Sequence, residues 1–206
     1  VYFDSVREAI DVRHIMASGA LPPGFPPVEI DHELFWDGGV ISNTPLDVVL
    51  DDEPRVSTLC FMVDLWDPMG PLPRTLDDVN ERQKDIRYAS RSERAIANYR
   101  RSHNLRRAVM AMWKELPPAS RAKPELEQIS WLGCTTTMQI VHLIYQNEEW
   151  ETESKDYEFS RASIADHRSA GRRDAMRAIR EKRWEEPVPP NVGVMVYEYP
   201  PRNVAF

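Results

Sequence analysis

The sequence predicts an α/β fold in which helices cover a parallel sheet. The clearest signal is the run "VSTLCFMVDLW" at 56–66, which is apolar at neighbouring as well as alternate positions. A strand of that kind is typical of a parallel sheet covered on both faces. A second run, "TTTMQIVHLIYQ" at 135–146, is rich in β-branched residues, which favour strands. A predicted helix at 42–52 separates a short predicted strand, "LFWDGG" at 34–39, from the run at 56–66, and strand–helix–strand order is typical of α/β domains.

The elements before the first of these strands are short. "VYF" at 1–3 is interpreted as a strand remnant, and "DVRHIMASGAL" at 11–21 as a helix that Pro22 and Pro23 stop. "GFPPVEIDHE" is interpreted as a proline-rich loop, and "LFWDGG" as a short strand that ends in a turn. A further helix is expected to begin in "SNTPLDVVLDD", with Ser42, Asn43 or Thr44 as its N-cap and Pro45 in its first turn.

After residue 66 the pattern becomes mostly helical. Residues 67–74 are interpreted as a loop, and 76–116 as helical, with "NYRRSHN" as a point where the helix could break in two. Pro117 and Pro118 are expected to end this region. An acidic loop at 148–160 precedes a basic helix at 161–184, and the proline-rich tail at 185–206 is expected to be extended and to lie on the surface.

The composition is that of an ordinary globular protein. The 206 residues are 42% hydrophobic and 29% charged, enough for one large domain or two small ones. We find no apolar run of transmembrane length and no signal-peptide pattern, so we expect a cytoplasmic protein that could attach peripherally to a membrane. Cys60 and Cys134 lie in apolar surroundings and are interpreted as free thiols in a reducing compartment. The five histidines show no metal-ligand spacing, so no metal or other cofactor is expected.

The net charge of −7 conceals two basic segments. Residues 82–107 carry nine basic and two acidic side chains, and residues 161–183 carry eight and three. Such helices can meet an anionic membrane surface, or they can be solvated faces that the acidic remainder of the chain neutralises. Nucleic acid is not the expected partner, because the basic segments lack interleaved aromatic residues and match no reader motif.

Asp37 is the candidate catalytic residue. It follows an apolar run and precedes Gly38 and Gly39, in a chain with only eight glycines. An aspartate at the end of a strand points toward the crevice in which open α/β sheets bind ligands. Glycines after it let a substrate approach the carboxylate closely, so Asp37 could act as a general base toward a hydroxyl nucleophile. The alternative is that Asp-Gly-Gly is only a strand-ending turn.

Four segments in order make the first 50 residues resemble the patatin-like phospholipase family. They are Ala17-Ser18-Gly19-Ala20, Phe25-Pro26-Pro27, Asp37-Gly38-Gly39 and Asn43-Thr44-Pro45. Beyond them, "VDLWDPMGPLP" and "RQKDIRYASR" resemble a trailing domain of uncharacterised function that follows the patatin core in a bacterial subset. The resemblance implies a three-layer α/β/α sheet, present here as its C-terminal portion at 1–66, with a mostly helical extension at 67–206.

The same resemblance implies an acyl-ester hydrolase with a Ser–Asp dyad, in which Asp37 is the aspartate. The serine is expected in a Gly-Xaa-Ser-Xaa-Gly elbow, and a glycine-rich loop is expected to stabilise the oxyanion. Neither occurs here: around Ser18, Met16 and Ala20 stand where the elbow has glycines. Ser18 and Gly19, like Gly38 and Gly39, are therefore expected to shape the site.

In the family, the elbow and the loop precede the matched segment. We therefore expect that Val1 is an internal residue of a longer protein and that the N-terminal half of that protein carries the nucleophile. The expected substrate is a lipid or another acyl ester, and this chain alone is expected to be inactive. The alternative is a non-catalytic interaction or membrane-surface docking module on a patatin scaffold.

Overall fold

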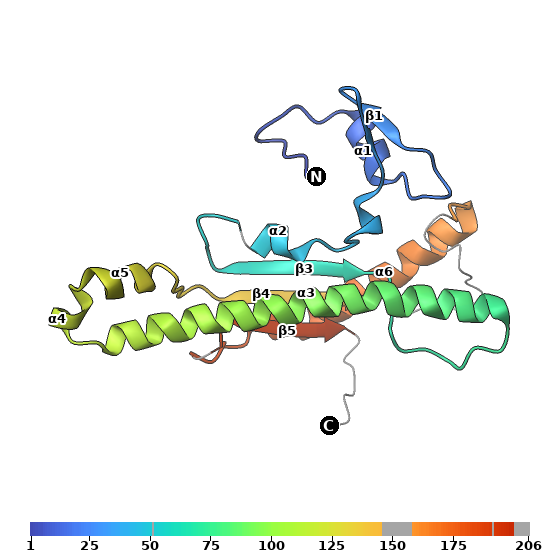
Figure 1. The fold of residues 1–206 in the computed structure, drawn as a ribbon. Helices are drawn as coiled ribbons and strands as arrows, with labels where there is room; N and C mark the ends of the chain where they lie inside the picture. The colour runs from blue at the N-terminus through green and yellow to red at the C-terminus, as the bar shows by residue number, and fades with distance from the viewer. Residues whose placement is uncertain (51, 146–157, 191, 200–206) are drawn as a thin grey trace. The chain divides into compact units, whose positions relative to one another are not determined.

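A computed structural model describes residues 1–50, 52–145, 158–190 and 192–199 (Figure 1). The contacts divide the chain into an N-terminal unit, Val1–Pro45, and a C-terminal unit, Leu46–Phe206. The strand at 56–66 therefore joins the C-terminal unit, while the predicted domain boundary between residues 66 and 67 stays a prediction. Each unit is described by itself below.

The N-terminal unit consists of one helix, one hairpin and one short helical turn. Helix α1 spans Val12–Ser18, strand β1 Val28–Ile30, strand β2 Glu33–Phe35 and the 3₁₀ turn η1 Gly38–Val40. Strands β1 and β2 pair antiparallel, with Val28 opposite Phe35. Residues 1–3, predicted as a strand remnant, form no strand here; Phe3 instead packs edge-on against His14 and Phe35, at ring-centroid distances of 4.5 and 5.2 Å.

The C-terminal unit contains a parallel sheet of three strands. Strands β3 (Thr58–Asp64), β4 (Met138–Ile144) and β5 (Val194–Tyr199) lie in the order β3-β4-β5. The register places Thr58 opposite Met138 and Met138 opposite Val194. The α/β fold with a parallel sheet is confirmed, as are the two strands predicted from their composition.

Helices lie on both faces of this sheet, which gives three layers within the unit. On one face, α2 (Leu46–Leu50) and α3 (Leu76–Glu115) pack through Leu50 and Ile96 onto Met138 and Val194. On the other face, α6 (Arg161–Glu181) packs through Ala178 onto Val141, Tyr197 and Tyr199. The turn η2, Arg183–Glu185, follows α6, and α4 (Pro118–Arg121) and α5 (Pro124–Ser130) follow α3. Figure 1 shows α3 and α6 on opposite sides of the strands.

Helix α3 is one continuous helix, so the break considered at 98–104 does not occur. Its start is fixed by a capping box, in which the Thr75 side chain accepts a hydrogen bond from the Asp78 backbone and the Asp78 side chain accepts one from the Thr75 backbone. Its end is at Leu116, where Pro117 cannot continue the helix, as predicted. These caps let the helix run the full length of the sheet (Figure 1).

Polar side chains in the second half of α3 hold the beginnings of β4 and β5. His103 Nε2 donates to the Thr136 carbonyl at 2.9 Å, and Asn104 Oδ1 accepts from the Gly193 backbone at 3.0 Å. Arg107 donates to the carbonyls of Pro190, Thr135 and Thr136 at 2.9, 3.2 and 3.1 Å, and to Thr137 Oγ1 at 2.9 Å. We call His103, Asn104 and Arg107 the α3 clamp.

Two expectations about the sheet are wrong. The tail expected on the surface contains β5, in which Val194, Tyr197 and Tyr199 are buried. Strand β3, expected in the centre, is an edge strand among the described residues, and only alternate side chains are covered by protein. The exposed apolar residues of β3 and of the position after it are Leu59, Phe61, Val63 and Leu65.

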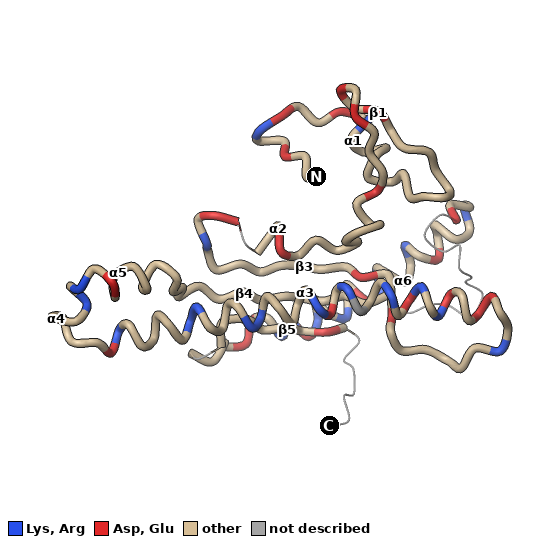
Figure 2. The backbone as a smooth tube through the Cα atoms, viewed as in Figure 1, with Lys and Arg blue, Asp and Glu red and all other residues tan. Residues whose placement is uncertain are grey.

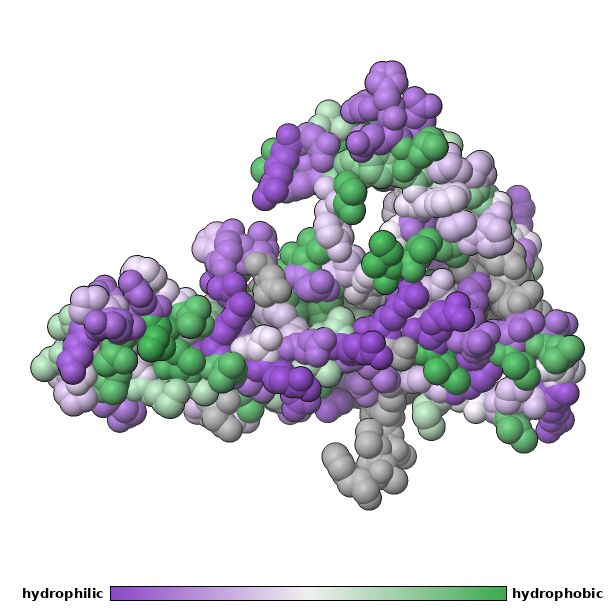
Figure 3. All heavy atoms as spheres, in the orientation of Figure 1, coloured by the Kyte–Doolittle hydropathy of each residue, from purple (hydrophilic) through white to green (hydrophobic). Residues whose placement is uncertain are grey.

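Charge and hydropathy are unevenly distributed over the described surface. Figure 2 shows Lys and Arg recurring along α3 and α6, the two basic segments of the sequence. Figure 3 shows apolar residues gathered over the α4–α5 segment; exposed apolar residues there include Ile129, Trp131 and Leu132. In the part of the chain that the structure describes, no helix is long and apolar enough to cross a bilayer. The predicted acidic loop falls mostly on 146–157, outside the described residues.

Candidate functional site

The Asp37 turn is built by a short strand and two glycines that serve different purposes. Asp37 follows β2 and Trp36 and caps η1, where its Oδ1 accepts a hydrogen bond from the Gly39 backbone at 2.7 Å. A Cβ on Gly39 would lie 3.1 Å from that oxygen, so a larger residue would press on the carboxylate. A Cβ on Gly38 would meet nothing within 4 Å. Gly39 therefore permits the cap, and Gly38 leaves the space beside it open.

This hydrogen bond occupies only one oxygen of the carboxylate. Within the described part of the chain, Oδ2 of Asp37 has no hydrogen-bond or ion-pair partner, and the residue is half-buried. A carboxylate with one oxygen fixed by the backbone has a defined orientation, and its second oxygen can accept a proton or a hydrogen bond from a ligand. The Asp37 carboxylate is therefore oriented as a general base has to be, with one oxygen left to accept a proton.

Backbone and indole hydrogen bonds link the Asp37 turn to the other predicted motifs. The Asp37 backbone N–H donates to the Ala20 carbonyl at 3.1 Å, which joins the turn to the small-residue segment after α1. Trp36 Nε1 donates to the Phe25 carbonyl at 3.3 Å, which joins it to the Phe-Pro-Pro loop. Three of the four motif segments are therefore held next to one another.

Ser18 and Gly19 lie at the C-terminal end of α1, beside the residue that contacts Asp37. Ser18 is exposed and is the last residue of the helix, and the Gly19 backbone donates to the Met16 carbonyl at 3.1 Å. A Cβ on Gly19 would come no closer than 3.8 Å to its surroundings, so this glycine is not required by crowding. The hydrogen bond from Asp37 reaches Ala20; no hydrogen bond joins Asp37 and Ser18 among the described residues.

The start of α1 is stabilised by its own charges. Asp11 caps the helix and His14 completes a capping box with it. The hydrogen bond from the Arg13 side chain, opposed by partial burial and reinforced by the Arg13 backbone, holds the pKa of the Asp11 carboxyl far below its usual range. Asp11 therefore stays ionised at lower pH than a free aspartate does, and its charged form is the one that caps α1.

The strand that leads to Asp37 belongs to a hairpin and not to the parallel sheet. Asp37 was expected at the carboxyl edge of a strand in an open α/β sheet, but β2 pairs only with β1 in the described structure. Strand β1 lies in a segment predicted as a loop. The hairpin turn, Asp31 and His32, has φ angles of 50° and 70°, the left-handed conformation of a type I′ turn. The turn contains no glycine, so the usual sequence signal of a two-residue hairpin turn is absent.

A second set of ionisable groups lies inside the C-terminal unit and was not predicted. His142 on β4 is 1% exposed, and its Nε2 lies 3.5 Å from Oδ2 of Asp64, which is 2% exposed. Its Nδ1 lies 4.0 Å from Oε1 of Glu198, directly across the sheet on β5. Because these partners come from three strands, only the sheet register could have revealed the set. Among the described residues, no group of three or more acidic, histidine or cysteine side chains could hold a metal ion.

Two family models match the chain, one near its N-terminus and one further toward its C-terminus. Residues 86–191, just over half of the chain, match a family model described as patatin phospholipase. Residues 4–50, which contain all four motifs, match a model described as patatin-like phospholipase. Neither the curated proteins nor the solved structures contain a match. The resemblance inferred from the motifs is confirmed, and the chain belongs to the patatin-like phospholipase family of lipid acyl hydrolases.

Proposed function

We propose that Asp37 is the general base of a Ser–Asp dyad in a lipid acyl hydrolase, and that the nucleophilic serine precedes this chain in the full protein. The observation that carries the proposal is the geometry of the carboxylate: the Gly39 backbone fixes Oδ1 at 2.7 Å, and Oδ2 has no hydrogen-bond or ion-pair partner among the described residues. The family match over residues 4–50 supports an acyl ester as the substrate.

The dyad would act in two steps. The Asp37 carboxylate takes the proton of the serine hydroxyl as the serine oxygen bonds to the ester carbonyl carbon, and the proton then passes to the departing alcohol. Water, deprotonated by the same carboxylate, attacks the acyl-serine, and the fatty acid leaves while the proton returns to the serine. The sequence contains no Gly-Xaa-Ser-Xaa-Gly elbow, so the chain alone lacks the nucleophile for the first step.

The proposal is tested by substituting Asp37 in the longest protein that the gene encodes, with a p-nitrophenyl ester as substrate. Asp37→Asn keeps an acceptor for Gly39 and removes the base, so kcat should fall about 10²- to 10⁴-fold. The matched control is Asp31→Asn in the hairpin turn, since asparagine also tolerates the left-handed φ of 50° there. The purified 206-residue chain should not turn the ester over. Turnover by either protein that survives Asp37→Asn would refute the dyad.

A second candidate function is docking to an anionic membrane surface through α6. On a helical projection, the exposed Arg161, Arg168 and Arg172 share one face with the exposed Ile164 and Ile179. Interspersed arginine and large apolar side chains are typical of helices that lie at a lipid interface. Co-sedimentation with vesicles should then require anionic lipid and weaken with added salt. Binding that is the same to neutral vesicles would instead indicate a solvated basic face.

A further inference from the structure

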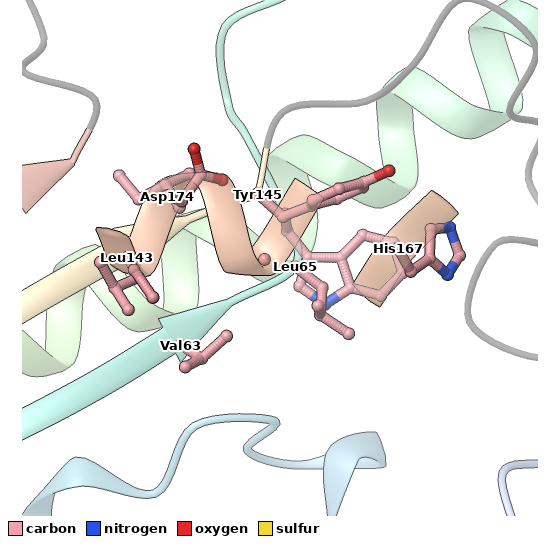
Figure 4. Close-up of a pocket in the computed structure, with 10 residues that line it drawn as sticks. Val63, Leu65, Leu143, Tyr145, His167 and Asp174 are labelled. Carbon is pink, nitrogen blue, oxygen red and sulfur yellow. The ribbon is translucent and has the colours of Figure 1, made fainter. Parts of the chain in front are cut away.

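An apolar pocket lies between α6 and the ends of β3 and β4 in the C-terminal unit (Figure 4). Its volume is about 340 Å³, within the range of small-molecule sites. The carboxyl ends of parallel strands are also where α/β sheets bind ligands. The residues that line it are Val63, Leu65, Trp66, Leu143, Ile144, Tyr145, His167, Gly171, Asp174 and Ala175.

The helical wall of the pocket is kept open by small side chains. His167, Gly171, Asp174 and Ala175 are spaced i, i+4, i+7 and i+8 along α6, so they share one face of the helix. A Cβ on Gly171 would meet nothing within 4 Å, so the glycine is not needed for packing inside the protein. Glycine is unfavourable within a helix. Its position on this face is explained by the space that it leaves in front of the sheet.

The opposite wall is apolar sheet surface that the described part of the chain leaves exposed. Val63 on β3 is 60% exposed, and Leu65 after the strand is 49% exposed. Leu143 on the neighbouring β4 continues this surface, since Val63 and Leu143 are register partners. A ligand in the pocket would therefore remove from water apolar surface that folding leaves exposed.

The polar groups of the pocket lie toward its ends. Figure 4 shows the Tyr145 hydroxyl and His167 at one end, with Leu143 and Asp174 at the other. The rings of Tyr145 and His167 meet edge to face at 5.5 Å. Burial raises the pKa of the Asp174 carboxyl, although Arg177 and Arg173 oppose this. Most of the surface that lines the pocket is apolar.

We propose that this pocket binds one aliphatic acyl chain of a lipid. Its mostly apolar lining and exposed β3 wall fit an unbranched aliphatic chain, while a sugar or a phosphate would find too few polar partners there. The identification of the ligand as the acyl chain of a lipid rests on the lipid acyl hydrolase function proposed above. The pocket lies in the segment that matches the patatin phospholipase model, residues 86–191, and on β3 before it.

The test is calorimetric titration of the purified 206-residue chain with hexanol, octanol and decanol. Neutral alkanols reproduce an aliphatic chain without the charge of a lipid head group. Each added methylene should lower Kd about fourfold until the pocket is full. A glycol ether of the same length as decanol should bind at least tenfold more weakly. No binding, or affinity independent of chain length, overturns the proposal.

Substitutions then place the binding in the pocket. Gly171→Leu fills the space in front of the sheet and should weaken decanol binding at least tenfold, while Ala165→Leu on the exposed face of the same helix should not change it. Val63→Thr keeps the shape and strand preference of the side chain and should weaken binding severalfold. Equal binding by Gly171→Leu and the unsubstituted chain overturns the assignment.

Two further measurements separate this proposal from its alternatives. Asp37→Asn should bind decanol as the unsubstituted chain does, so failure of the dyad and failure of the pocket are distinguishable. Sedimentation velocity tests whether the pocket is instead a contact between copies of the chain. A dimer that Gly171→Leu dissociates and decanol does not would overturn the proposal.

Discussion

Removing the guanidinium of Arg107 should destabilise the C-terminal unit more than removing any exposed arginine of α3. Its four hydrogen bonds join the helix to Pro190, before β5, and to Thr135, Thr136 and Thr137, before β4. In the described structure, no other side chain of the α3 clamp forms hydrogen bonds to the approaches of both strands. In Arg107→Ala the helix keeps its backbone, because alanine is a good helix former, and loses only these bonds.

The expected loss is about 3 kcal/mol. A hydrogen bond from a charged group contributes about 1.5–3 kcal/mol. Nη1 divides its interaction among three acceptors, so we count one full bond for it and one for Nε. The low end of the range applies, because Thr135 and Pro190 are exposed and can recover water as a partner. At about 2–4 °C per kcal/mol, Tm should fall by about 6–12 °C.

Urea denaturation followed by circular dichroism measures this loss. The midpoint should fall in Arg107→Ala with little change in the slope m. Arg101→Ala, an exposed arginine on the same helix, should stay within about 0.5 kcal/mol of the unsubstituted chain. Arg107→Lys should recover less than half of the loss, because an ammonium group cannot match the planar fork. Equal midpoints for Arg107→Ala and Arg101→Ala would show that water replaces these bonds without cost.

The same denaturation assay checks the remaining predictions. Gly193→Ala would place a Cβ 2.8 Å from Cδ2 of His103 and should cost about 1–3 kcal/mol, and a cost near zero would mean that the clamp adjusts freely. His142→Leu leaves the Asp64 carboxylate buried without its imidazole and should cost about 3 kcal/mol, whereas a gain in stability would show that the pair is unfavourable. Burial is the main cause that lowers the pKa of His103, with the charges of Arg106, Arg107 and Arg55 acting in the same direction against the Thr136 hydrogen bond. The unfolded chain therefore binds this proton first, and the contribution of His103 to stability should be constant above about pH 6.5 and fall as the pH drops through that value toward the folded pKa. His103→Gln should remove that part of the pH dependence, and identical slopes for the two proteins would contradict the argument.

Local sequence signals were sufficient where a single segment determines its own structure. Thr58–Asp64 and Met138–Ile144 were predicted as strands because their apolar and β-branched residues are continuous. The end of α3 was predicted because Pro117 stops a helix wherever it falls. In each case the physical cause lies within a few residues of the effect.

Strand β5 was missed because its neighbours in the sequence indicate the opposite structure. Prolines precede and follow Val194–Tyr199, and they led to the prediction of an extended surface tail. What buries the strand is pairing with β4, whose residues lie more than 50 positions earlier. The α3 clamp was missed for the same reason, since Asn104 and Gly193 are 89 residues apart.

The Asp37 site was predicted from the order of its motifs and not from any rule of local structure. The hydrogen bond from Asp37 to Ala20 shows why that order is informative: the small-residue segment and the Asp-Gly-Gly turn pack against each other. The hairpin that precedes Asp37 was not predicted. Asp31 and His32 adopt the left-handed conformations of its turn, and Asn-Gly is the pair of residues usually found there.

The wrong expectation for β3 and the acyl-chain pocket have one origin. The apolar residues on both faces of β3 predicted a strand covered on both sides, but α6 packs on the sheet through Ala178 onto β4 and β5. Trp184 of η2 meets Phe61 edge to face at 5.4 Å, but Phe61 and Val63 both stay exposed. Apolar residues at the surface of a strand have to be explained by what contacts them. At this end of β3, Val63 and Leu65 line the same pocket as Gly171. The apolar residues that led to the prediction of a central strand therefore form the wall on which an acyl chain can bind.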